Sequence, residues 1–360
     1  MLITPTLECG GAERYVSLLC RYLNKDRFSV CLLVLDNEHP FYEIEDPRVE
    51  VINLGIRHAR NALFAIRREI NQRKPDVVYS VANHINLLLA TFRWMFPKHI
   101  LFIARESSIM SSNLRRSKWP ALFRKLANKF YDRLDCIICQ SNAMQLDLTQ
   151  NLGIPVQKTE MIPNPVAVDP ALKPAPPAPG IMKLLTVARL SEEKGLDRLI
   201  RAVAKLDFPF IYNIIGEGPE REKLEALIAA LQLGDKVFLQ GEQLRPYHHQ
   251  EDAHLFLMGS YYEGFPNVLI EAGVLGIPVV AFDAPGGIAE IIEDGLNGFL
   301  VKSSKEEVFM SAILRAREHK FNHEKIIAAT KIRYGVDKII PATENLIIRL
   351  LAEKTGQQLK

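Results

Sequence analysis

The chain has 360 residues, of which 48% are hydrophobic and 24% are charged, and its formal net charge is +3. This length predicts two folded domains, and the apolar content with low net charge excludes intrinsic disorder. No apolar run is long enough to span a membrane, charged residues break any signal peptide, and five scattered cysteines favour a reducing cytoplasm over a disulfide framework.

The first part of the chain alternates short apolar runs with stretches of helical spacing. The expected strands are Leu2–Thr4, Val30–Leu35, Val49–Leu54, Val77–Val81, Ile100–Ile103, Cys136–Cys139 and Thr159–Ile162. Helical spacing covers intervals such as Ala62–Arg73 and Pro120–Leu134. Strands that alternate with helices predict a parallel sheet that is covered on both faces.

The composition changes after residue 162, where seven prolines fall within 17 residues. Proline lacks a backbone donor, so this stretch predicts a linker at 166–180 between domains at 1–165 and 181–336. The rhythm then restarts, with expected strands at Lys183–Ala188, Phe210–Ile215, Val237–Leu239, Leu255–Met258, Pro278–Phe282 and Gly298–Val301. Two doubly wound α/β domains would face each other across a cleft at the carboxyl ends of their strands.

A basic segment lies in the first domain, with ten Lys or Arg and two acidic residues between positions 93 and 133. Its centre holds Arg115, Arg116, Lys118 and Trp119. Basic and aromatic residues together suit an anionic membrane surface. A solvated helix face whose aromatic residues pack inward fits as well, and nucleic acid is the weaker alternative.

Several candidate residues follow strands of the first domain. Gly10 and Gly11 precede a helical stretch, where close backbone approach and unpaired N–H groups suit an anion, although a plain turn is equally compatible. His84 follows Val77–Val81, and Arg105 and Glu106 follow Ile100–Ile103. His84 is a candidate for catalysis, and Arg105 and Glu106 are candidates for binding an anionic acceptor; the alternative is that all three are ordinary polar residues.

Candidate residues also follow strands of the second domain. Arg189 and Lys194 lie five residues apart after a strand, which suits a diphosphate held without a metal, although pairing with neighbouring glutamates is the alternative. Gly216 and Gly218 end the next strand and would leave room for a base or ribose, or form a plain turn. No cysteine–histidine set has metal-site spacing.

The sequence EGFPNVLIE carries the strongest signal. Glu263 and Glu271 lie a little over two turns apart if both are helical; if the helix starts near Asn267, Glu263 stands at the tip of the preceding loop and Glu271 one turn in. A carboxylate accepts hydrogen bonds from vicinal hydroxyls, which is how sugars and ribose are held. Two unrelated surface acids are the alternative.

The motifs GGAER, IPNPV, RLSEEKG, GEGP, EGFPNVLIE and EIIEDGLNGFLV occur in that order. In this combination the chain resembles the retaining glycosyltransferases of family 4, which include enzymes of bacterial surface-polysaccharide, lipopolysaccharide and lipid-linked glycan synthesis. The resemblance covers essentially the whole chain. It implies the GT-B architecture, with two Rossmann-like domains, the nucleotide sugar held mainly by the second, and a final helix at about 339–353 that packs back on the first.

The resemblance also assigns roles to matched positions. Arg189 and Lys194 would neutralise the donor diphosphate, Glu271 would bind the ribose, and Glu263 would bind the donor sugar. His84 lies three residues after the position where many members carry a histidine. The remaining donor-site positions would be Gly10, Gly11, Gly216, Gly218, Phe265, Pro266 and Asn267.

The implied reaction moves a hexose or N-acetylhexosamine from a UDP-sugar to a growing lipid-linked or oligosaccharide acceptor. It would retain the anomeric configuration and need no metal or other cofactor. The expected location is the cytoplasmic face of the membrane, with peripheral contact and no nucleic-acid partner. The alternatives are a catalytically silent nucleotide-sugar-binding subunit and a sugar-nucleotide epimerase of the same architecture.

Overall fold

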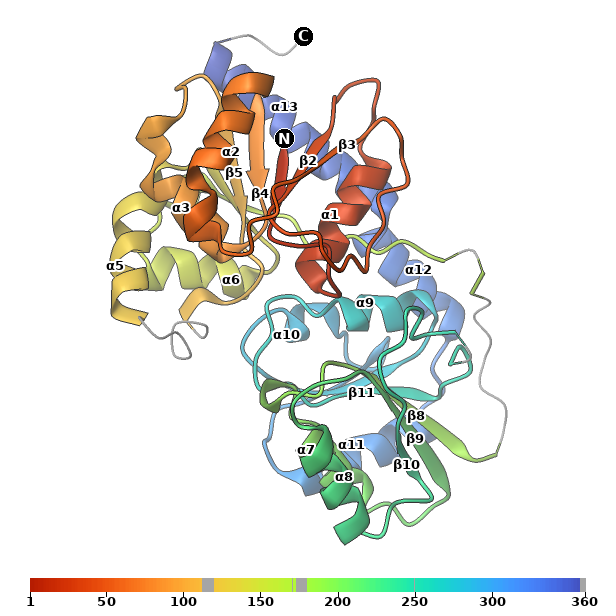
Figure 1. Cartoon of the computed structure of the whole chain (residues 1–360). Coiled ribbons are helices and arrows are strands. Elements are labelled where there is room, and N and C mark those ends of the chain that lie inside the picture. The colour runs from red at the N-terminus through yellow and green to blue at the C-terminus, as the bar shows by residue number, and fades with distance from the viewer. Residues whose placement is uncertain (112–119, 170, 173–179, 249, 357–360) are drawn as a thin grey trace. The chain divides into compact units, whose positions relative to one another are not determined.

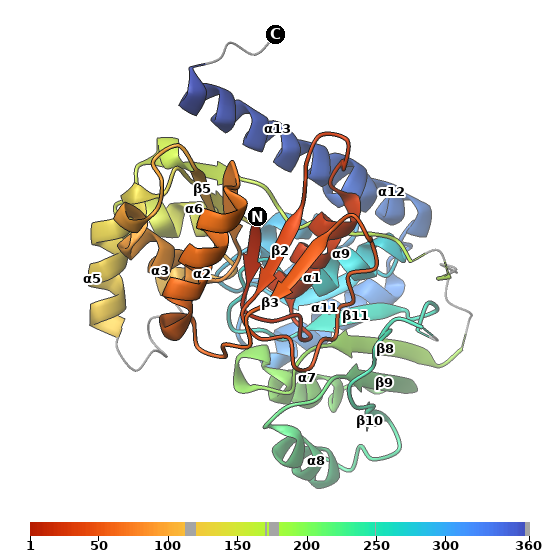
Figure 2. The same cartoon turned by 45° about the horizontal axis from the view of Figure 1, so that its top comes forward.

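The computed structural model describes residues 1–111, 120–169, 171–172, 180–248 and 250–356. The chain divides into two compact units, Met1–Pro165 with Val336–Lys360, and Val166–Gly335. Each unit is a parallel sheet with helices on both faces (Figures 1 and 2). The last helix therefore belongs to the first unit, although the whole second unit separates the two in sequence.

Among the described residues, the first unit has a seven-stranded parallel sheet in the order β3-β2-β1-β4-β5-β6-β7. Its strands are β1 (Leu2–Thr4), β2 (Cys31–Val34), β3 (Glu50–Asn53), β4 (Val77–Ser80), β5 (Leu101–Arg105), β6 (Cys136–Cys139) and β7 (Thr159–Met161). The short strand β1 is central, because Leu2 pairs with Leu32 on one side and with Tyr79 on the other. Side chains point alternately to the two faces of a strand, so helices cover both faces.

The two faces of this sheet carry different helices. One face packs against α2 (Ala59–Arg73), α3 (Asn83–Thr91), α5 (Pro120–Phe130) and α6 (Asn142–Leu146). The opposite face packs against α1 (Gly11–Tyr22) and α13 (Val336–Thr355). Short turns complete the unit: η1 (Arg93–Met95), η2 (Tyr131–Arg133), η3 (Asp147–Asn151) and η4 (Val156–Lys158). The helix expected at Pro120–Leu134 ends earlier, at Phe130, because the chain tightens into η2.

The described part of the second unit has a six-stranded parallel sheet in the order β10-β9-β8-β11-β12-β13. Its strands are β8 (Met182–Val187), β9 (Phe210–Ile215), β10 (Val237–Leu239), β11 (Leu255–Met258), β12 (Val279–Phe282) and β13 (Gly298–Val301). The strand order changes direction between β8 and β11. In doubly wound sheets, ligands bind beyond the carboxyl ends of the strands at such a switch point.

Helices again cover both faces of the second sheet. One face packs against α7 (Leu196–Val203), α8 (Arg221–Ala230) and α11 (Glu306–Glu318), and the short turn η5 (Glu192–Lys194) precedes α7. The other packs against α9 (Asn267–Val274), α10 (Ile288–Ile291) and the end of α12 (His323–Tyr334). Helices α9 and α12 lie close together, since a Cβ at Gly273 would lie 2.4 Å from the Thr330 hydroxyl oxygen.

Candidate active site

Two loops meet at the switch point of the second sheet. The first follows β8 and contains Arg189 and Lys194, and the second follows β11 and contains Glu263. Because β8 and β11 are parallel neighbours, their carboxyl ends lie at the same sheet edge. Residues almost 70 positions apart in sequence are therefore brought together.

Lys194 and Glu263 form an ion pair at this edge. The Lys194 Nζ atom lies 2.7 Å from Glu263 Oε1, and the Ser260 hydroxyl donates to the same oxygen at 2.6 Å. The side chains are 26% and 12% exposed, so the pair is only partly screened by water. This edge of the second sheet, called the rim below, thus presents a fixed cation and a fixed carboxylate side by side.

Arg189 lies on the same loop, with an exposed side chain. Within the described residues, no ion pair or hydrogen bond holds its guanidinium. The backbone around it is nevertheless firmly placed, because Ala188 donates to the Ile215 carbonyl and Leu190 to the Glu217 carbonyl. A held backbone with an exposed cation suits an incoming anionic ligand.

Gly216 and Gly218 have a packing role in this arrangement. A Cβ at Gly216, where φ is +143°, would lie 2.0 Å from the Ala188 carbonyl oxygen, and one at Gly218 would lie 2.3 Å from that of Leu190. The missing side chains therefore let the end of β9 press against the Arg189 loop. Their role in leaving room for a base or ribose stays a prediction.

Helix α9 begins at Asn267, with Pro266 at its N-cap, so of the two placements left open by the sequence Glu263 lies on the loop before the helix and Glu271 within it. The Phe265 ring is buried and meets the Tyr334 ring edge-on, at 5.6 Å between centroids. Its side chain therefore belongs to the core, and only its backbone remains for a ligand. Glu271 is the fifth residue of α9; its exposed fraction is 7%, so it lies largely inside the unit.

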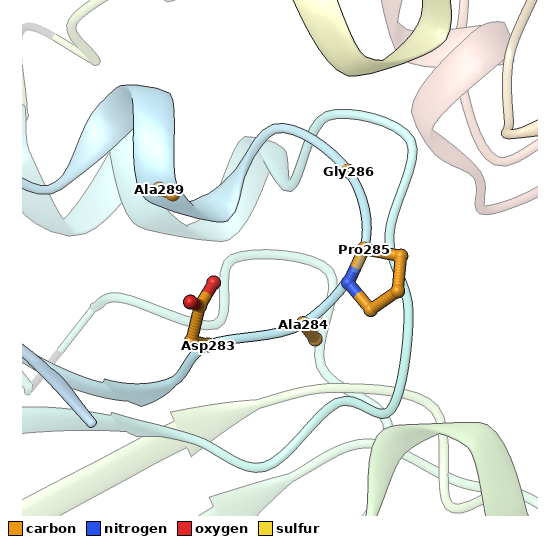
Figure 3. Close-up of a pocket in the computed structure, with 5 residues that line it drawn as sticks. All are labelled: Asp283, Ala284, Pro285, Gly286 and Ala289. Carbon is orange, nitrogen blue, oxygen red and sulfur yellow. The ribbon is translucent and has the colours of Figure 1, made fainter. Parts of the chain in front are cut away.

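A pocket of about 300 Å³ lies on the loop between β12 and α10 (Figure 3). It is lined by Asp283, Ala284, Pro285, Gly286 and Ala289. Figure 3 shows the Asp283 carboxyl group pointing toward the helix that carries Ala289.

The pocket loop is bonded to the Glu263 loop. The Glu263 N–H donates to the Pro285 carbonyl at 3.0 Å, and the Gly287 N–H donates to that of Gly264 at 2.9 Å. Gly286 has φ +124°, and a Cβ there would lie 1.6 Å from the Glu263 carbonyl oxygen. The sequence analysis did not identify this loop, although Pro285 and two glycines after an apolar run were an available signal.

In the first unit, Gly10 is the N-cap of α1 and Gly11 is its first residue. A Cβ at Gly10 would lie 2.1 Å from Glu13 Oε2, so glycine is needed for the Glu13 carboxyl to fold back over the helix start. Burial raises the pKa of Glu13, since the charged carboxylate loses hydration there. The helix start thus already has an acidic neighbour.

His84 is the second residue of α3, close to the end of β4. Its side chain is exposed, and partial desolvation lowers the pKa of its imidazole. It therefore stands at the carboxyl edge of the first sheet in a mainly neutral form at pH 7.

Arg105 and Glu106 lie inside the first unit, each 1% exposed, and not on its surface as an acceptor-binding role would suggest. The reason is that Arg105 ends the buried strand β5. Its guanidinium donates to the Ile162 carbonyl at 3.0 Å and the Asn164 side-chain oxygen at 2.7 Å, and it lies 3.9 Å from the Tyr15 ring centroid.

The Glu106 carboxyl is part of a buried polar network. Its Oε1 accepts hydrogen bonds from the Asn86 amide at 2.9 Å and from the Tyr131 hydroxyl at 3.0 Å. Burial raises the pKa of Glu106 to about 7, against the opposing effect of these two donors.

The four residues at the centre of the basic segment, Arg115, Arg116, Lys118 and Trp119, lie outside the described residues. Among the described residues of the same 93–133 segment, Trp94 is 74% exposed and Leu122 is 53% exposed. Across the described part of the chain, no group of three or more His, Cys, Asp or Glu residues is placed to hold a metal ion.

Two family models match the chain. Residues 9–170 match the model described as Glycosyltransferase Family 4, and residues 176–333 match the one described as Glycosyl transferases group 1. The chain carries a family 4 glycosyltransferase domain followed by a group 1 glycosyl transferase domain. The predicted family and the predicted glycosyltransferase activity are confirmed. The Lys194–Glu263 pair of this glycosyltransferase lies within the group 1 region, and His84 lies within the family 4 region.

The glycosyltransferase is similar to bacterial enzymes of surface-glycan synthesis. It is 28% identical to an N-acetylgalactosamine-N,N'-diacetylbacillosaminyl-diphospho-undecaprenol 4-alpha-N-acetylgalactosaminyltransferase of Campylobacter jejuni, over 84% of this chain and 85% of that protein. It is 24% identical to the lipopolysaccharide 1,6-galactosyltransferase of Escherichia coli, over 77% of this chain and 76% of that one.

Solved structures establish the architecture. The apo form of the lipopolysaccharide outer core galactosyltransferase WaaB gives a TM-score of 0.76 at 21% identity, over 97% of this chain and 99% of that chain. Anabaena HepE in complex with UDP-glucose gives 0.75 at 21% identity, over 97% and 98%. These similarities confirm the predicted GT-B fold. None of the helices in the described ranges has the length and apolar character that crossing a membrane requires.

Proposed function

We propose that this glycosyltransferase moves a hexose or N-acetylhexosamine from a UDP-sugar to a growing lipid-linked or lipopolysaccharide-type glycan, with retention of configuration. The observation that carries the proposal is the Lys194–Glu263 pair at the switch point of the second sheet. A cation suits the diphosphate, and the neighbouring carboxylate suits sugar hydroxyls. The names of the relatives support the acceptor class, and the HepE complex supports a UDP-linked donor.

The chemistry follows from where charge develops. As the anomeric C–O bond of the donor breaks, negative charge grows on the departing UDP, and Lys194 and Arg189 stabilise it. Glu263 and Glu271 hold hydroxyls of the sugar and the ribose. The acceptor oxygen attacks from the side of the leaving group, and its proton passes to a departing phosphate oxygen. These steps need no metal ion, since the side-chain cations supply the positive charge.

The pocket on the loop between β12 and α10 fits a neutral, hydroxyl-rich group better than a phosphate. Within the described part of the chain, its lining contributes the Asp283 carboxylate and no cationic side chain. A carboxylate accepts hydrogen bonds from hydroxyls and repels phosphate. The donor sugar would therefore lie toward this loop, and the diphosphate toward Lys194 and Arg189.

The acceptor side is proposed to lie against the cytoplasmic membrane face. The basic segment of the first unit supplies cations, and Trp94 and Leu122 are large apolar side chains exposed near it. Cations attract anionic lipid, and exposed apolar side chains insert at the interface. Contact of this kind would be peripheral.

Replacing Lys194 tests the reaction. In Lys194→Ala we expect transfer to fall roughly 10²–10³-fold, because one charged contact to a leaving group is worth about 2–4 kcal/mol in the barrier. The measurement is release of UDP from a panel of UDP-sugars, with and without an undecaprenyl-diphosphate-linked acceptor.

Lys223→Ala is the matched control, because Lys223 lies on the exposed surface of α8 and pairs only with Glu220 among the described residues. It should leave turnover unchanged, and both variants should keep the wild-type melting temperature within a few degrees. Near-normal turnover by a folded Lys194→Ala would contradict the proposed role. A rate of UDP release that is the same with and without the acceptor would contradict transfer to that acceptor.

A further inference from the structure

Arg198 is a buried cation close to the proposed donor site. It is the third residue of α7, and only three residues separate it from Lys194. It is 8% exposed. Neither the motif matches nor the proposed mechanism uses it.

The Arg198 guanidinium holds the loop that follows β11. Its Nε atom donates to the Gly259 carbonyl at 2.6 Å, and its Nη2 atom donates to the Ser260 carbonyl at 2.6 Å. The acceptors are carbonyls, and among the described residues no carboxylate forms a salt bridge with this cation. A planar, forked donor is suited to holding two successive carbonyls at once.

Aromatic rings enclose the same guanidinium. Its central carbon lies 4.2 Å from the Tyr261 ring centroid and 3.9 Å from that of Phe282. Tyr261 is part of the held loop, and Phe282 ends β12 beside it. The cation is therefore fixed between the β11 loop and the end of the neighbouring strand, where cation–π attraction partly replaces lost hydration.

The loop that Arg198 holds also carries the sugar-binding carboxylate. Directly after Ser260, the Tyr261 N–H donates to the Glu193 carbonyl at 2.8 Å, and the Ser260 hydroxyl donates to Glu263. Glu263 in turn pairs with Lys194. A short chain of contacts thus leads from Arg198 to both charged groups at the rim.

Two glycines make this arrangement tight. Gly195 has φ +55°, and a Cβ there would lie 2.1 Å from the Gly259 carbonyl oxygen and 2.9 Å from Arg198 Nε. A Cβ at Gly259 would lie 2.4 Å from the Gly195 carbonyl oxygen. The turn after Lys194 and the start of the β11 loop are therefore in direct backbone contact, with Arg198 across the junction.

We propose that Arg198 is a positioning residue for the donor diphosphate. It fixes the Gly259–Ser260 backbone against the Lys194 turn and adds a buried positive charge beneath the rim. Burying a cation away from any carboxylate makes the folded state less stable. A well-packed apolar side chain at this position would give a more stable fold. The charge is explained if the ligand above it is anionic. This proposal rests on the proposed function, because it takes the ligand to be a nucleoside diphosphate.

The test compares UDP with uridine, which lacks the phosphates. In Arg198→Met we expect the affinity for UDP to fall at least tenfold, while the affinity for uridine stays within twofold of wild type. In Arg198→Lys the charge is kept but one ammonium replaces the fork, so an intermediate loss of UDP affinity is expected. Titration calorimetry on the full chain measures both ligands.

Arg201→Met is the matched control, because Arg201 is an exposed arginine one turn further along α7. It should bind both ligands as wild type does. Amide hydrogen exchange adds a readout that needs no ligand, since Arg198→Met should speed exchange at Tyr261 but not in β11. If Arg198→Met does not fold, Arg198→Lys is used instead, and the measurement is whether it loses affinity for UDP but not for uridine.

The outcomes separate the two proposals. Wild-type protein that binds UDP no better than uridine would overturn the proposed donor class, and the role of Arg198 with it. Wild-type preference for UDP that persists in Arg198→Met would overturn the role of Arg198 alone. An equal loss for UDP and uridine would also overturn it, because that result indicates general damage to the site.

Discussion

At the scale of single residues, the partner of a charged group decides what the group can do. Lys194 and Glu263 were expected to bind different parts of a donor, and the structure pairs them at 2.7 Å. A diphosphate that binds Lys194 must therefore compete with Glu263, and sugar hydroxyls can then satisfy the released carboxylate. The ion pair thus keeps the two charges in place, each partly neutralised by the other, where we propose that the donor binds.

Glu106 gives a residue-scale prediction about pH. Burial raises the pKa of its carboxyl from 4.5 to about 7. Between these values the folded chain keeps a proton that the unfolded chain releases, so stability falls as the pH rises. The loss reaches about 3 kcal/mol above pH 7. Glu106→Gln resembles the neutral form and should remove this loss, which melting temperatures at pH 5 and pH 8 would show.

The control for Glu106→Gln is Glu45→Gln, at an exposed glutamate of the same unit. That variant should follow the wild-type pH response. The interpretation of Glu106 as a buried neutral acid is wrong if Glu106→Gln loses as much stability as wild type between pH 5 and pH 8.

At the scale of elements, close backbone contact forms the edge of the second sheet where we propose that the donor binds. Gly195 and Gly259 bring together the loops after β8 and β11, and Gly286 brings the β12 loop against Glu263. In each case a Cβ would lie within 2.5 Å of a carbonyl oxygen, which no real side chain tolerates. The ends of three neighbouring strands, β8, β11 and β12, are thereby held together at one edge of the sheet.

The contact between α9 and α12 yields an element-scale prediction. A Cβ at Gly273 would lie 2.4 Å from Thr330 Oγ1, so Gly273→Ala should destabilise the protein by about 1–3 kcal/mol through overpacking. Thr330→Ala removes the clashing atoms, and the double variant should recover most of that loss. A double-mutant cycle from urea unfolding measures the coupling, and additive effects would contradict direct packing.

At the scale of the whole molecule, charge is unevenly distributed along the chain. Residues 1–160 contain 22 Lys or Arg against 16 Asp or Glu, whereas residues 161–360 contain 23 against 26. A protein with one basic half is attracted to an anionic surface through that half. This is the physical basis for the proposed membrane contact.

Neutralising the centre of the basic segment tests this contact. We expect Arg115→Gln, Arg116→Gln and Lys118→Gln together to weaken binding to phosphatidylglycerol vesicles at least tenfold, because each basic group contributes about 1 kcal/mol near such a surface. Co-sedimentation at several salt concentrations measures it. Neutralising the exposed Lys302, Lys305 and Lys320 of the second unit should have little effect. Equal binding by the two triple variants would remove the membrane interpretation of this segment.

The amino-acid sequence by itself determined much of the architecture. Alternating apolar runs and helical stretches are local patterns, and they predicted two parallel α/β sheets that the structure confirms. The glycine–proline turn also indicated that a helix follows it, and the structure starts this helix, α9, at Asn267. The family followed from motifs spread along the whole chain.

Only the tertiary structure decided which strand ends meet and which side chains they bury. Strand order brings Lys194 to Glu263 and Arg198 to Gly259, and no local pattern encodes contacts between residues more than 60 positions apart. The same reason explains why Arg105 and Glu106 lie inside the first unit. A polar pair after an apolar run has the same sequence pattern whether it is exposed to solvent or buried. Here the pair is buried, and neighbouring segments of the chain supply its hydrogen bonds.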